Sequence, residues 1–523
     1  MSEDILAKIV RMRKADIERL GPNFGIEIPA TRRRGHVEFL GTPGAILEVK
    51  RASPSKGDIA PDLVPTELAT TYAEAHAQAI SVLTEGNFFK GSLRDLIAVA
   101  DLMESRRQQG LHACAVLRKD FLLYEDEIDI AHRCGADAVL LIARILDDEQ
   151  LVKMAKRAQS FDMQAFVEVR EKDDFRKLQI VTDALGDAAA KTIVAGVNSR
   201  DLATFHTDPL VPASVRSKLP SKAVFESGIL TPADADYARS LGFTGILVGE
   251  AVAKNPPLAK DVVSAFESGC ENAKGKFWKK FAERRDARRT AQTKIAQADA
   301  VADPSKTDAS RGNRPMVKIC GITREEDGML AAKLGADMLG FVFSKTKRLT
   351  TEGFVRDFAS KLRAARTPES TPLLVGVITD PNSEEGKTAI RLAQDDILDA
   401  VQFHGIAPSA ADTCLAHYCA ARVGEPADFE QVDSLRKNGE PRILLDAKVE
   451  GIPGGTGKTI PESLLREKAG DLPLWLAGGI TPENVSAICE KFQPELIDVS
   501  SGVEDAPGIK NHEKMRALFS RID

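Results

Sequence analysis

The sequence predicts an α/β protein made of two (β/α)8 barrels in tandem, joined by a polar linker. The chain has 523 residues, which is too long for one compact core and fits two large domains. Two series of β-rich apolar runs alternate with helix-like stretches, and each series reaches eight runs, the number that closes such a barrel. Between the series, residues 271–315 are rich in Lys, Arg, Ala, Asp and Ser and contain no β-rich run.

The first series lies between Ala45 and Ala251, and a polar or charged turn follows each run. The runs are AILEVK (45–50), AISVLTE (79–85), ACAVLRKDF (113–121), AVLLIAR (138–144), AFVEV (165–169), IVAGVNSR (193–200), AVFESGI (223–229) and GILVGEA (245–251). We expect this barrel to occupy residues 1–268. Its first residues mix charged and apolar side chains at helical spacing, which predicts one extra helix at the N-terminus.

The second series begins at Met316 and predicts a barrel over residues 315–523. Its runs are MVKICGI (316–322), MLGFVF (338–343), LLVGVIT (373–379), LDAVQFHG (398–405), CAARV (419–423), RILLDA (442–447), LWLAGGI (474–480) and LIDVSSG (496–502), of which the fifth is weak. Several connections look short, especially between Arg422 and Val432, so we expect this barrel to lack one regular helix. The sequence leaves open whether the linker, residues 269–314, is helical or disordered.

The composition favours small molecules as partners. The chain has 71 basic and 77 acidic residues, and its net charge of −6 provides no general electrostatic attraction to nucleic acid or to anionic membranes. A basic stretch at 273–294 is interrupted by Glu283 and Asp286, so a solvated connecting helix explains it better than a nucleic-acid or membrane site. No run has the length of an apolar membrane span, and the chain start lacks the apolar core of a secretion signal. The seven cysteines form no CxxC pair, so we expect free thiols and a cytosolic protein. We also expect a monomer.

Polar residues are dense after the runs of the first series. In a barrel of this kind the carboxyl ends of the strands build the active site. Glu48 and Lys50 alternate on one run, so both can face the interior, where an unpaired charge is costly; they need each other or a charged ligand. The candidate site residues are Glu48, Lys50, Ser53, Phe89, Lys119, Phe121, Glu168, Asn198, Arg200, Glu226, Ser227, Gly228, Gly249 and Glu250.

Residues 1–265 resemble indole-3-glycerol-phosphate synthase. The segments EVKRASPSKG, ISVLTE to FFKGS, LRKDF, FVEV, GVNSRDL, ESGI and LVGEA occur in the same order in that family. The resemblance implies closure of the indole ring of carboxyphenylaminodeoxyribulose phosphate with loss of carbon dioxide and water, without a cofactor or a metal. It implies that Lys119 is the general acid of the condensation and that Lys50, Glu48 and Glu168 share the remaining proton transfers.

The same resemblance implies how the substrate binds. Asn198 and Arg200 would orient the anthranilate portion, Ser53 its carboxylate, and Phe89 and Phe121 would pack against its ring. The phosphate would lie against the backbone near the ends of the last two strands, where glycine-bearing turns offer N–H donors. The residues concerned there are Glu226, Ser227, Gly228, Gly249 and Glu250.

Cys320 ends the first run of the second series. A lone buried Cys usually acts as a small hydrophobic residue, so a catalytic role for Cys320 depends on which other residues accompany it. Arg348, His404 and Asp446 follow the second, fourth and sixth runs, and the remaining candidates lie in segments rich in Gly and Ser that bring backbone N–H groups close to a phosphate. Those candidates are Gly455, Gly457, Gly478, Gly479, Ser500 and Ser501.

Residues 316–522 resemble phosphoribosylanthranilate isomerase through KICGIT, SKTKR, VQFHG, LLD, GGTGK, LAGGI and DVSSGVE, in that order. The resemblance implies an Amadori rearrangement in which Asp446 protonates the ribose ring oxygen and Cys320 takes the C2 proton. It also implies that Arg348 binds the anthranilate carboxylate. These roles require the Cys320 thiol to become more acidic and the Asp446 carboxyl to stay protonated.

Two alternative functions and a possible zinc site are less favoured by the sequence. The ordered Lys, Glu, Asn and Arg set argues against another phosphosugar isomerase or lyase. The presence of both Cys320 and Asp446 argues against a barrel that survives only as a binding module. Cys414, His417 and Cys419 fall in one stretch expected to be helical, with no fourth partner, so we interpret them as helix packing and not as a zinc site.

Overall fold

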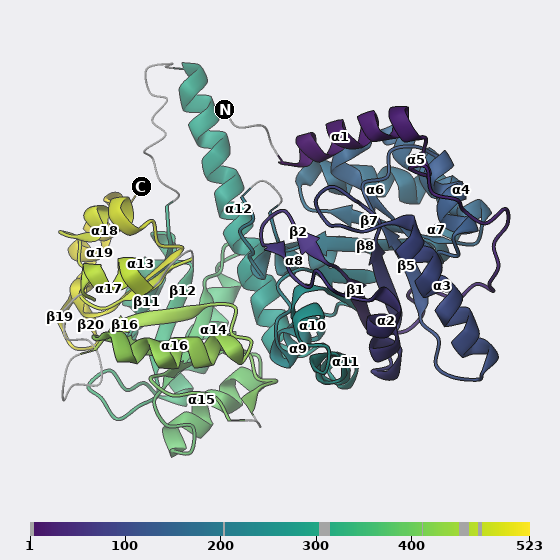
Figure 1. The fold of residues 1–523 in the computed structure, drawn as a ribbon. Coiled ribbons are helices and arrows are strands. Elements are labelled where there is room, and N and C mark those ends of the chain that lie inside the picture. Colours follow the sequence, from purple (N-terminus) through teal and green to yellow (C-terminus); the bar gives the residue numbers. More distant parts are fainter. Residues whose placement is uncertain are drawn as a thin grey trace. The chain divides into compact units, whose positions relative to one another are not determined.

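The computed structural model describes residues 5–201, 204–302, 314–409, 412–448, 460–468 and 473–522. The chain forms two compact units, Met1–Glu271 and Asn272–Asp523. Each unit contains a closed barrel of eight parallel strands (Figure 1). The predicted fold class of two barrels in tandem is therefore confirmed.

The barrel of the first unit closes where β1 pairs with both β4 and β10. Every residue of its strands is buried except Lys119 at the end of β5, as expected for a parallel sheet covered on both faces. The strands are β1 (Gly44–Val49), β4 (Ala79–Leu83), β5 (Ala115–Lys119), β6 (Ala138–Ile142), β7 (Gln164–Val169), β8 (Ile193–Asn198), β9 (Ala223–Glu226) and β10 (Gly245–Val248). A short hairpin of β2 (Ala52–Ser53) and β3 (Gly57–Asp58) follows β1.

Helices surround this barrel, and several begin at side chains that bond the first turn. Ser92 accepts from the N–H of Arg94 at the start of α3, and Thr231 and Asp234 form a capping box at the start of α9. The helices are α1 (Ile5–Leu20), α2 (Pro65–Glu74), α3 (Leu93–Gln108), α4 (Asp126–Arg133), α5 (Asp148–Ser160), α6 (Lys172–Leu185), α7 (Ala189–Thr192), α8 (Leu210–Val215), α9 (Pro232–Ser240), α10 (Glu250–Lys254) and α11 (Leu258–Ser268). The predicted extra helix at the N-terminus is α1.

The barrel of the second unit closes where β11 pairs with β12 and β18. Its strands are β11 (Met316–Cys320), β12 (Met338–Val342), β13 (Leu373–Ile378), β14 (Ala400–His404), β15 (His417–Val423), β16 (Ile443–Ala447), β17 (Trp475–Ala477) and β18 (Leu496–Val499). A hairpin of β19 (Glu504–Ala506) and β20 (Ile509–Lys510) follows the barrel. The helices of this unit are α12 (Ala273–Ala302), α13 (Glu325–Lys333), α14 (Glu352–Ala364), α15 (Glu384–Gln394), α16 (Phe429–Lys437), α17 (Glu462–Lys468), α18 (Val485–Phe492) and α19 (His512–Ser520).

Two expectations about the second barrel are wrong in detail. The region from Arg422 to Val432 does not lack a helix, because α16 begins at Phe429; the connection whose described residues contain no α-helix is the one between β14 and β15. His417 and Cys419 lie on strand β15 and not on a helix. The weak fifth run forms the last five residues of that strand, which pairs with β14 and β16 on its two sides, and its apolar residues are continuous instead of alternating.

Helix α12 covers most of the segment expected to be the linker, and its first half packs within the second unit. Phe277, Trp278 and Phe281 are buried, and Trp278 and Phe281 have ring centroids 5.8 and 4.8 Å from Trp475, at the start of β17. The Lys274 ammonium lies 2.7 Å from Glu440, which also contacts His417 at 2.9 Å. His417, Cys419 and Glu440 could together approach one cation, but Lys274 supplies the positive charge there.

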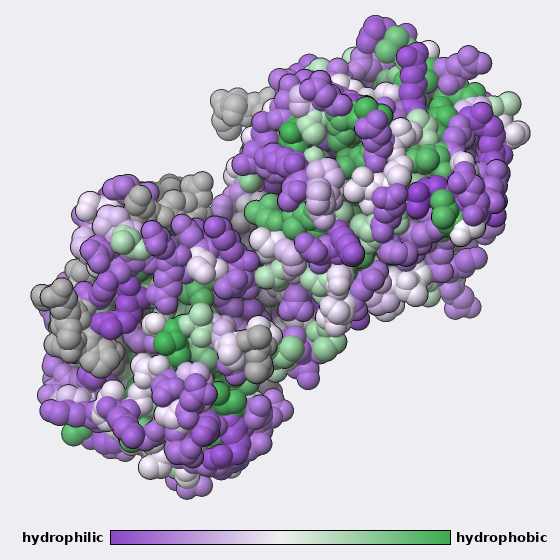
Figure 2. Space-filling view, turned by 60° about the horizontal axis from the view of Figure 1, so that its bottom comes forward, coloured by the Kyte–Doolittle hydropathy of each residue, from purple (hydrophilic) through white to green (hydrophobic). Residues whose placement is uncertain are grey.

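The outer surface is mainly hydrophilic on the face drawn in Figure 2, where hydrophobic side chains form small separate patches on each unit. Leu230, which is 56% exposed, is among the most exposed large apolar side chains of the described residues. Among those residues, no helix has the length and apolar character needed to cross a membrane. The tail of the expected linker, residues 303–313, lies outside the described residues.

Candidate active sites in the two barrels

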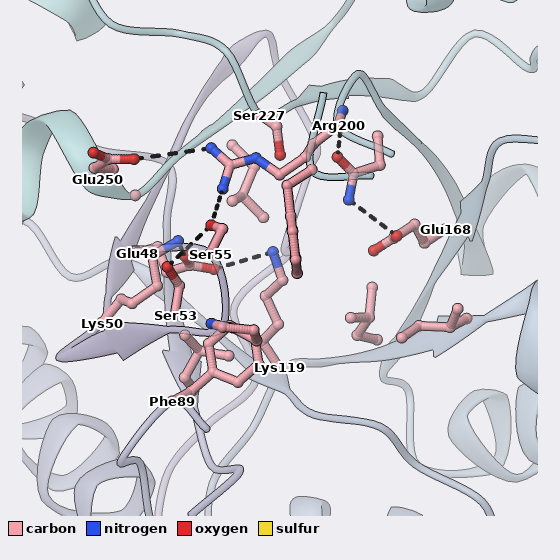
Figure 3. A pocket seen from close by; sticks show the side chains of 18 of the residues that line it. Glu48, Lys50, Ser53, Ser55, Phe89, Lys119, Glu168, Arg200, Ser227 and Glu250 are labelled. Atoms are coloured by element: carbon pink, nitrogen blue, oxygen red, sulfur yellow. Dashed lines mark hydrogen bonds and ion pairs between the residues drawn. The ribbon is translucent and has the colours of Figure 1, made fainter. Parts of the chain in front are cut away.

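The first unit has a pocket at the carboxyl ends of its strands (Figure 3). All the residues predicted for this barrel line the pocket except Glu226, which is buried beside Lys119. Strands β1, β5, β7 and β8 supply the charged and amide side chains, whereas the loops after β9 and β10 supply the glycine-bearing turns. The barrel therefore gathers at one place side chains that are widely separated along the chain.

Glu48 is the centre of an ion-pair cluster in this pocket. Its Oε1 lies 2.6 Å from Lys50 Nζ and its Oε2 lies 3.0 Å from Lys119 Nζ. Burial opposes ionisation of Glu48, but the two ammonium groups outweigh it and lower the pKa of Glu48 to about 2. Glu48 is therefore a carboxylate, and its charge in turn helps to raise the pKa of Lys119 against the effect of burial.

Two further buried carboxyl groups surround Lys119. Burial raises the pKa of Glu168, which accepts a hydrogen bond from Asn198 Nδ2 at 3.2 Å. Burial, together with the charge of Glu168, raises the pKa of Glu226 well above its ordinary value, and a Glu226 carboxyl oxygen lies 3.6 Å from Lys119 Nζ. The cluster thus holds one ionised carboxylate and two carboxyl groups that keep protons more readily than usual.

Arg200 crosses the pocket from the end of β8 (Figure 3). Its Nη1 donates to Ser55 Oγ at 3.0 Å, and its Nη2 lies 3.8 Å from Glu250, whose other carboxyl oxygen lies 2.7 Å from Lys254. The Arg200 backbone N–H donates to Asn198 Oδ1 at 3.0 Å, which fixes the orientation of that amide. Ser53 is 3.4 Å from Ser55, so Ser55, which was not among the predicted site residues, links Ser53 to the guanidinium.

An apolar wall faces these charges. Phe89 and Phe121 lie with ring centroids 6.0 Å apart, and Ile5, Leu6 and Ile9 of α1 line the pocket with them. The backbone N–H of Phe89 donates to the Glu85 carboxylate at 3.0 Å, and the backbone N–H groups of the two preceding residues donate to it at shorter distances. Glu85 therefore fixes the backbone of the loop that carries Phe89.

Arg13 holds α1 in place over the pocket. This buried guanidinium donates to Asp120 at 2.6 Å and also contacts Glu127. Asp120 directly follows Lys119 and also accepts from Thr84. The helix that lines the pocket is thus tied to the strand end that carries Lys119.

The turn after β9 has an unusual backbone. Ser227 and Gly228 have φ angles of 65° and 76°, a region in which a side chain is usually strained. Ser199 Oγ donates to the Ser227 carbonyl at 2.9 Å and supports the turn. At the next strand end, a side chain at Gly249 would collide with Glu48 and Lys50, so this position brings backbone close to the ion pairs.

The second unit has a comparable pocket at the carboxyl ends of its strands. Eight predicted residues line it together: Cys320, Arg348, His404, Asp446, Gly478, Gly479, Ser500 and Ser501. Gly455 and Gly457 lie outside the described residues.

Burial raises the pKa of both Asp446 and Cys320, but the charged groups near the two residues differ. Burial and the nearby Asp498 raise the pKa of Asp446 to about 6. This shift has the direction that a proton donor needs. Burial also raises the pKa of the Cys320 thiol, although Lys318 opposes it, so this shift is opposite in direction to the one that the general-base role requires.

Arg348 already has a carboxylate partner. Its guanidinium holds Glu504 with two hydrogen bonds, from Nε at 3.0 Å and from Nη2 at 2.7 Å. Lys510 also lies 2.9 Å from Glu504, and its ammonium donates to the backbone carbonyls of Cys320 and Ser500. This buried network fixes the ends of β11 and β18 relative to each other.

Three buried polar residues in or directly behind this pocket were missed from the sequence: Gln402 and Asp498, which line it, and Lys318, which contacts both. The Lys318 ammonium lies 2.5 Å from Gln402 Oε1 and 2.6 Å from Asp498 Oδ2. Each of the three lies two residues before a predicted site residue on its strand or strand end. Because alternate residues of a strand point the same way, this spacing was a usable signal.

The fold and the pockets define a class: tandem (β/α)8 barrels, each with an acid–base pocket at the carboxyl ends of its strands. A family model described as indole-3-glycerol phosphate synthase matches residues 31–264, and one described as N-(5'-phosphoribosyl)anthranilate isomerase matches residues 317–521. The chain belongs to these two families, the first over its N-terminal barrel and the second over its C-terminal barrel.

The chain is also similar to individual curated proteins and solved structures. A multifunctional tryptophan biosynthesis protein of Schizosaccharomyces pombe is 31% identical over 92% of this chain and 59% of its own length. An indole-3-glycerol phosphate synthase of Roseiflexus is 37% identical over 50% of this chain and 97% of its own length. A solved phosphoribosylanthranilate isomerase of Thermotoga maritima is 33% identical, with 40% of this chain and 98% of that chain covered, at a TM-score of 0.34. The chain spans about three fifths of the multifunctional relative.

Proposed function

We propose that this chain catalyses two consecutive steps of tryptophan biosynthesis. The C-terminal barrel would isomerise phosphoribosylanthranilate to carboxyphenylaminodeoxyribulose phosphate, and the N-terminal barrel would close the indole ring to give indole-3-glycerol phosphate. The observation that carries the proposal is the presence of one acid–base pocket in each family-matched barrel, lined by most of the residues that the two resemblances imply.

In the isomerase site, Asp446 would give its proton to the ribose ring oxygen, which opens the ring, and Cys320 would remove the proton from C2. The raised pKa of Asp446 supports this role, because part of the population keeps its proton near neutral pH. Arg348 would bind the anthranilate carboxylate on the side of its guanidinium that Glu504 leaves open.

In the synthase site, Lys119 would protonate the ketone oxygen as the aromatic ring carbon attacks. Three carboxyl groups near Lys119 raise its pKa and keep it an ammonium group that is able to donate. Carbon dioxide then leaves from the anthranilate carboxyl position, and loss of the protonated hydroxyl as water completes the ring. Glu168, with its raised pKa, is suited to accept and return a proton in these last steps.

The substrate would lie between the charged cluster and the apolar wall. Phe89 and Phe121 would pack against its ring, Arg200, Asn198 and Ser53 would hold its anthranilate end, and its phosphate would reach the backbone after β9 and β10. We further propose a cytosolic monomer that needs no cofactor and binds neither nucleic acid nor a membrane; these points stay predictions.

The test is to give the purified protein freshly prepared phosphoribosylanthranilate and to identify the products over time. Formation of indole-3-glycerol phosphate is the expected result. Accumulation of carboxyphenylaminodeoxyribulose phosphate alone would refute the synthase assignment. A substrate that only breaks down at its spontaneous rate would refute the isomerase assignment.

A further inference from the structure

The side-chain amide of Gln402 is fixed in orientation within the second barrel. Lys318 Nζ and Tyr418 Oη both donate to its Oε1, at 2.5 and 2.9 Å. An ammonium group can only donate, so the atom that faces it must be the amide oxygen. The amide nitrogen of Gln402 therefore points the other way, toward His404.

This orientation determines the protonation of His404. Gln402 Nε2 lies 3.2 Å from His404 Nδ1, and an amide nitrogen donates without accepting. Nδ1 must then accept, which leaves the single ring proton on Nε2. Burial lowers the pKa of His404 to about 4, so the imidazole stays neutral near pH 7 and this tautomer persists.

The Nε2–H of His404 lies beside the acid of the proposed isomerase site. His404 Nε2 is 3.4 Å from Asp446 Oδ2, and this buried nitrogen has no hydrogen-bond partner in the structure. The other charged groups that act on Asp446 come from three other strands of the barrel: Asp498 on β18, Arg422 on β15 and Lys318 on β11. Of these, Lys318 is bonded to Asp498 and Gln402, so its donors point away from Asp446.

We propose that Gln402 is a positioning residue of the isomerase site, which holds His404 as the neutral tautomer whose Nε2–H stabilises the Asp446 carboxylate after Asp446 has given up its proton. The inference rests on the proposed role of Asp446 as general acid. No proton passes to His404 in this account: it donates a hydrogen bond, and Asp446 recovers its proton from solvent before the next turnover. A donor that strengthens as the acid ionises lowers the barrier to proton transfer.

The first experiment compares Gln402→Glu with the unaltered full-length protein. A glutamate of almost the same shape still accepts from Lys318 and Tyr418, but its second oxygen would face His404 Nδ1 and draw the ring proton there. We expect the isomerase kcat to fall about tenfold or more, with KM changed by no more than about twofold. Nitrogen NMR of labelled His404 should report the Nε2–H tautomer in the unaltered protein and the Nδ1–H tautomer in the variant.

A matched pair at position 404 separates the hydrogen bond from packing. His404→Gln can place an amide N–H near the former Nε2 and should keep the isomerase kcat within about threefold, whereas His404→Leu should lose about tenfold or more. Loss of the donor also raises the pKa of Asp446, so the limb of the pH profile that belongs to Asp446 should move to higher pH in His404→Leu and stay in place in His404→Gln. A purely structural role would not move this limb.

Two results would overturn the proposal. One is an Nδ1–H tautomer or an imidazolium in the unaltered protein near neutral pH. The other is full isomerase kcat in Gln402→Glu although the tautomer has changed. Failure of the proposed function is distinguishable, because it would appear as intact isomerisation in Asp446→Asn, whereas the NMR result does not depend on activity.

Discussion

Phe277 of helix α12 stacks on Tyr418 of strand β15, with ring centroids 6.0 Å apart and ring planes 13° apart. Tyr418 in turn donates to Gln402, a lining residue of the second pocket. Helix α12 therefore supports the side chains beneath this pocket, and we expect the second barrel to depend on this helix for its stability.

Removal of the α12 aromatic contacts should destabilise the second barrel. Trp278 is fully buried against Phe281 and Trp475. We expect Trp278→Ala to cost about 3–5 kcal/mol of unfolding free energy, because a large ring leaves a cavity. The loss of isomerase activity with increasing urea should occur at lower urea, while the synthase midpoint stays unchanged. Lys276→Ala, an exposed change on the same helix, should move neither midpoint, and an unaffected Trp278→Ala would show that α12 is dispensable.

Loss of the Lys119 ammonium should abolish ring closure alone. Lys119→Met keeps most of the side-chain volume but removes the proposed proton donor, and it leaves Glu48 with only Lys50 as a cation partner. We expect the synthase kcat to fall by about 10²–10⁴, measured with carboxyphenylaminodeoxyribulose phosphate as substrate. Isomerase activity of the same sample is the internal control, and Lys153→Met tests an exposed lysine elsewhere in the unit. Near-normal synthase activity in Lys119→Met would rule out the assigned role.

The raised pKa values of Asp446 and Cys320 predict an unusual pH profile for the isomerase. The reactive form needs a protonated Asp446 and a deprotonated Cys320, although Asp446 has a pKa of about 6 and the thiol a higher one. Below about pH 6 the acid is fully protonated while the thiolate decreases about tenfold per pH unit, so kcat/KM falls on acidification. Above about pH 6 the two ionisations cancel, and kcat/KM should stay level up to the thiol pKa.

The profile is measured as kcat/KM, which reports the free protein, with synthase activity followed in the same buffers. A steady rise through pH 6 to pH 8 would contradict the prediction, since it would mean that thiol ionisation alone limits the reaction.

Release of Arg13 should loosen the wall of the first pocket. Arg13→Met removes one of the two buried guanidinium groups that contact Asp120 and Glu127 and leaves Arg118 as their remaining partner, so we expect a cost below the roughly 3–5 kcal/mol of a fully broken buried ion pair. We expect a higher synthase KM, because the side chains of α1 that line the pocket are no longer held there, and unchanged isomerisation. Lys14→Met changes an exposed neighbour and should leave KM alone. An unaltered KM in Arg13→Met would mean that packing alone holds α1.

The fold was accessible from the sequence because its pattern is repetitive. Sixteen apolar runs, most of them separated by helix-like stretches, predict two parallel barrels, and even the weak fifth run of the second series marked β15. The strand ends were equally readable, since a polar residue such as Lys119 or Asp446 directly after an apolar run stands out. These signals are local in the sequence, and each closed barrel brings the residues that carry them together in one pocket.

Contacts between distant segments were not accessible in this way. The pairing of Arg13 with Asp120 spans 107 residues, and nothing local to either residue indicates it. The aromatic face of α12 looked like a basic solvated helix, because lysines and arginines surround Phe277 and Trp278 in the sequence. The pKa shift of Cys320 is opposite in direction to the one that a general base requires. It depends on burial, which only the folded barrel establishes.

The position of α1 affects how the protein can be handled. Ile5, Leu6 and Ile9 line the first pocket, so the first turns of α1 form part of the wall of the synthase site. A tag joined directly ahead of α1 would lie beside the pocket, with consequences for synthase measurements but not for isomerase measurements. Kinetic comparisons between the two barrels are therefore best made on protein purified through a C-terminal tag or with its N-terminal tag removed.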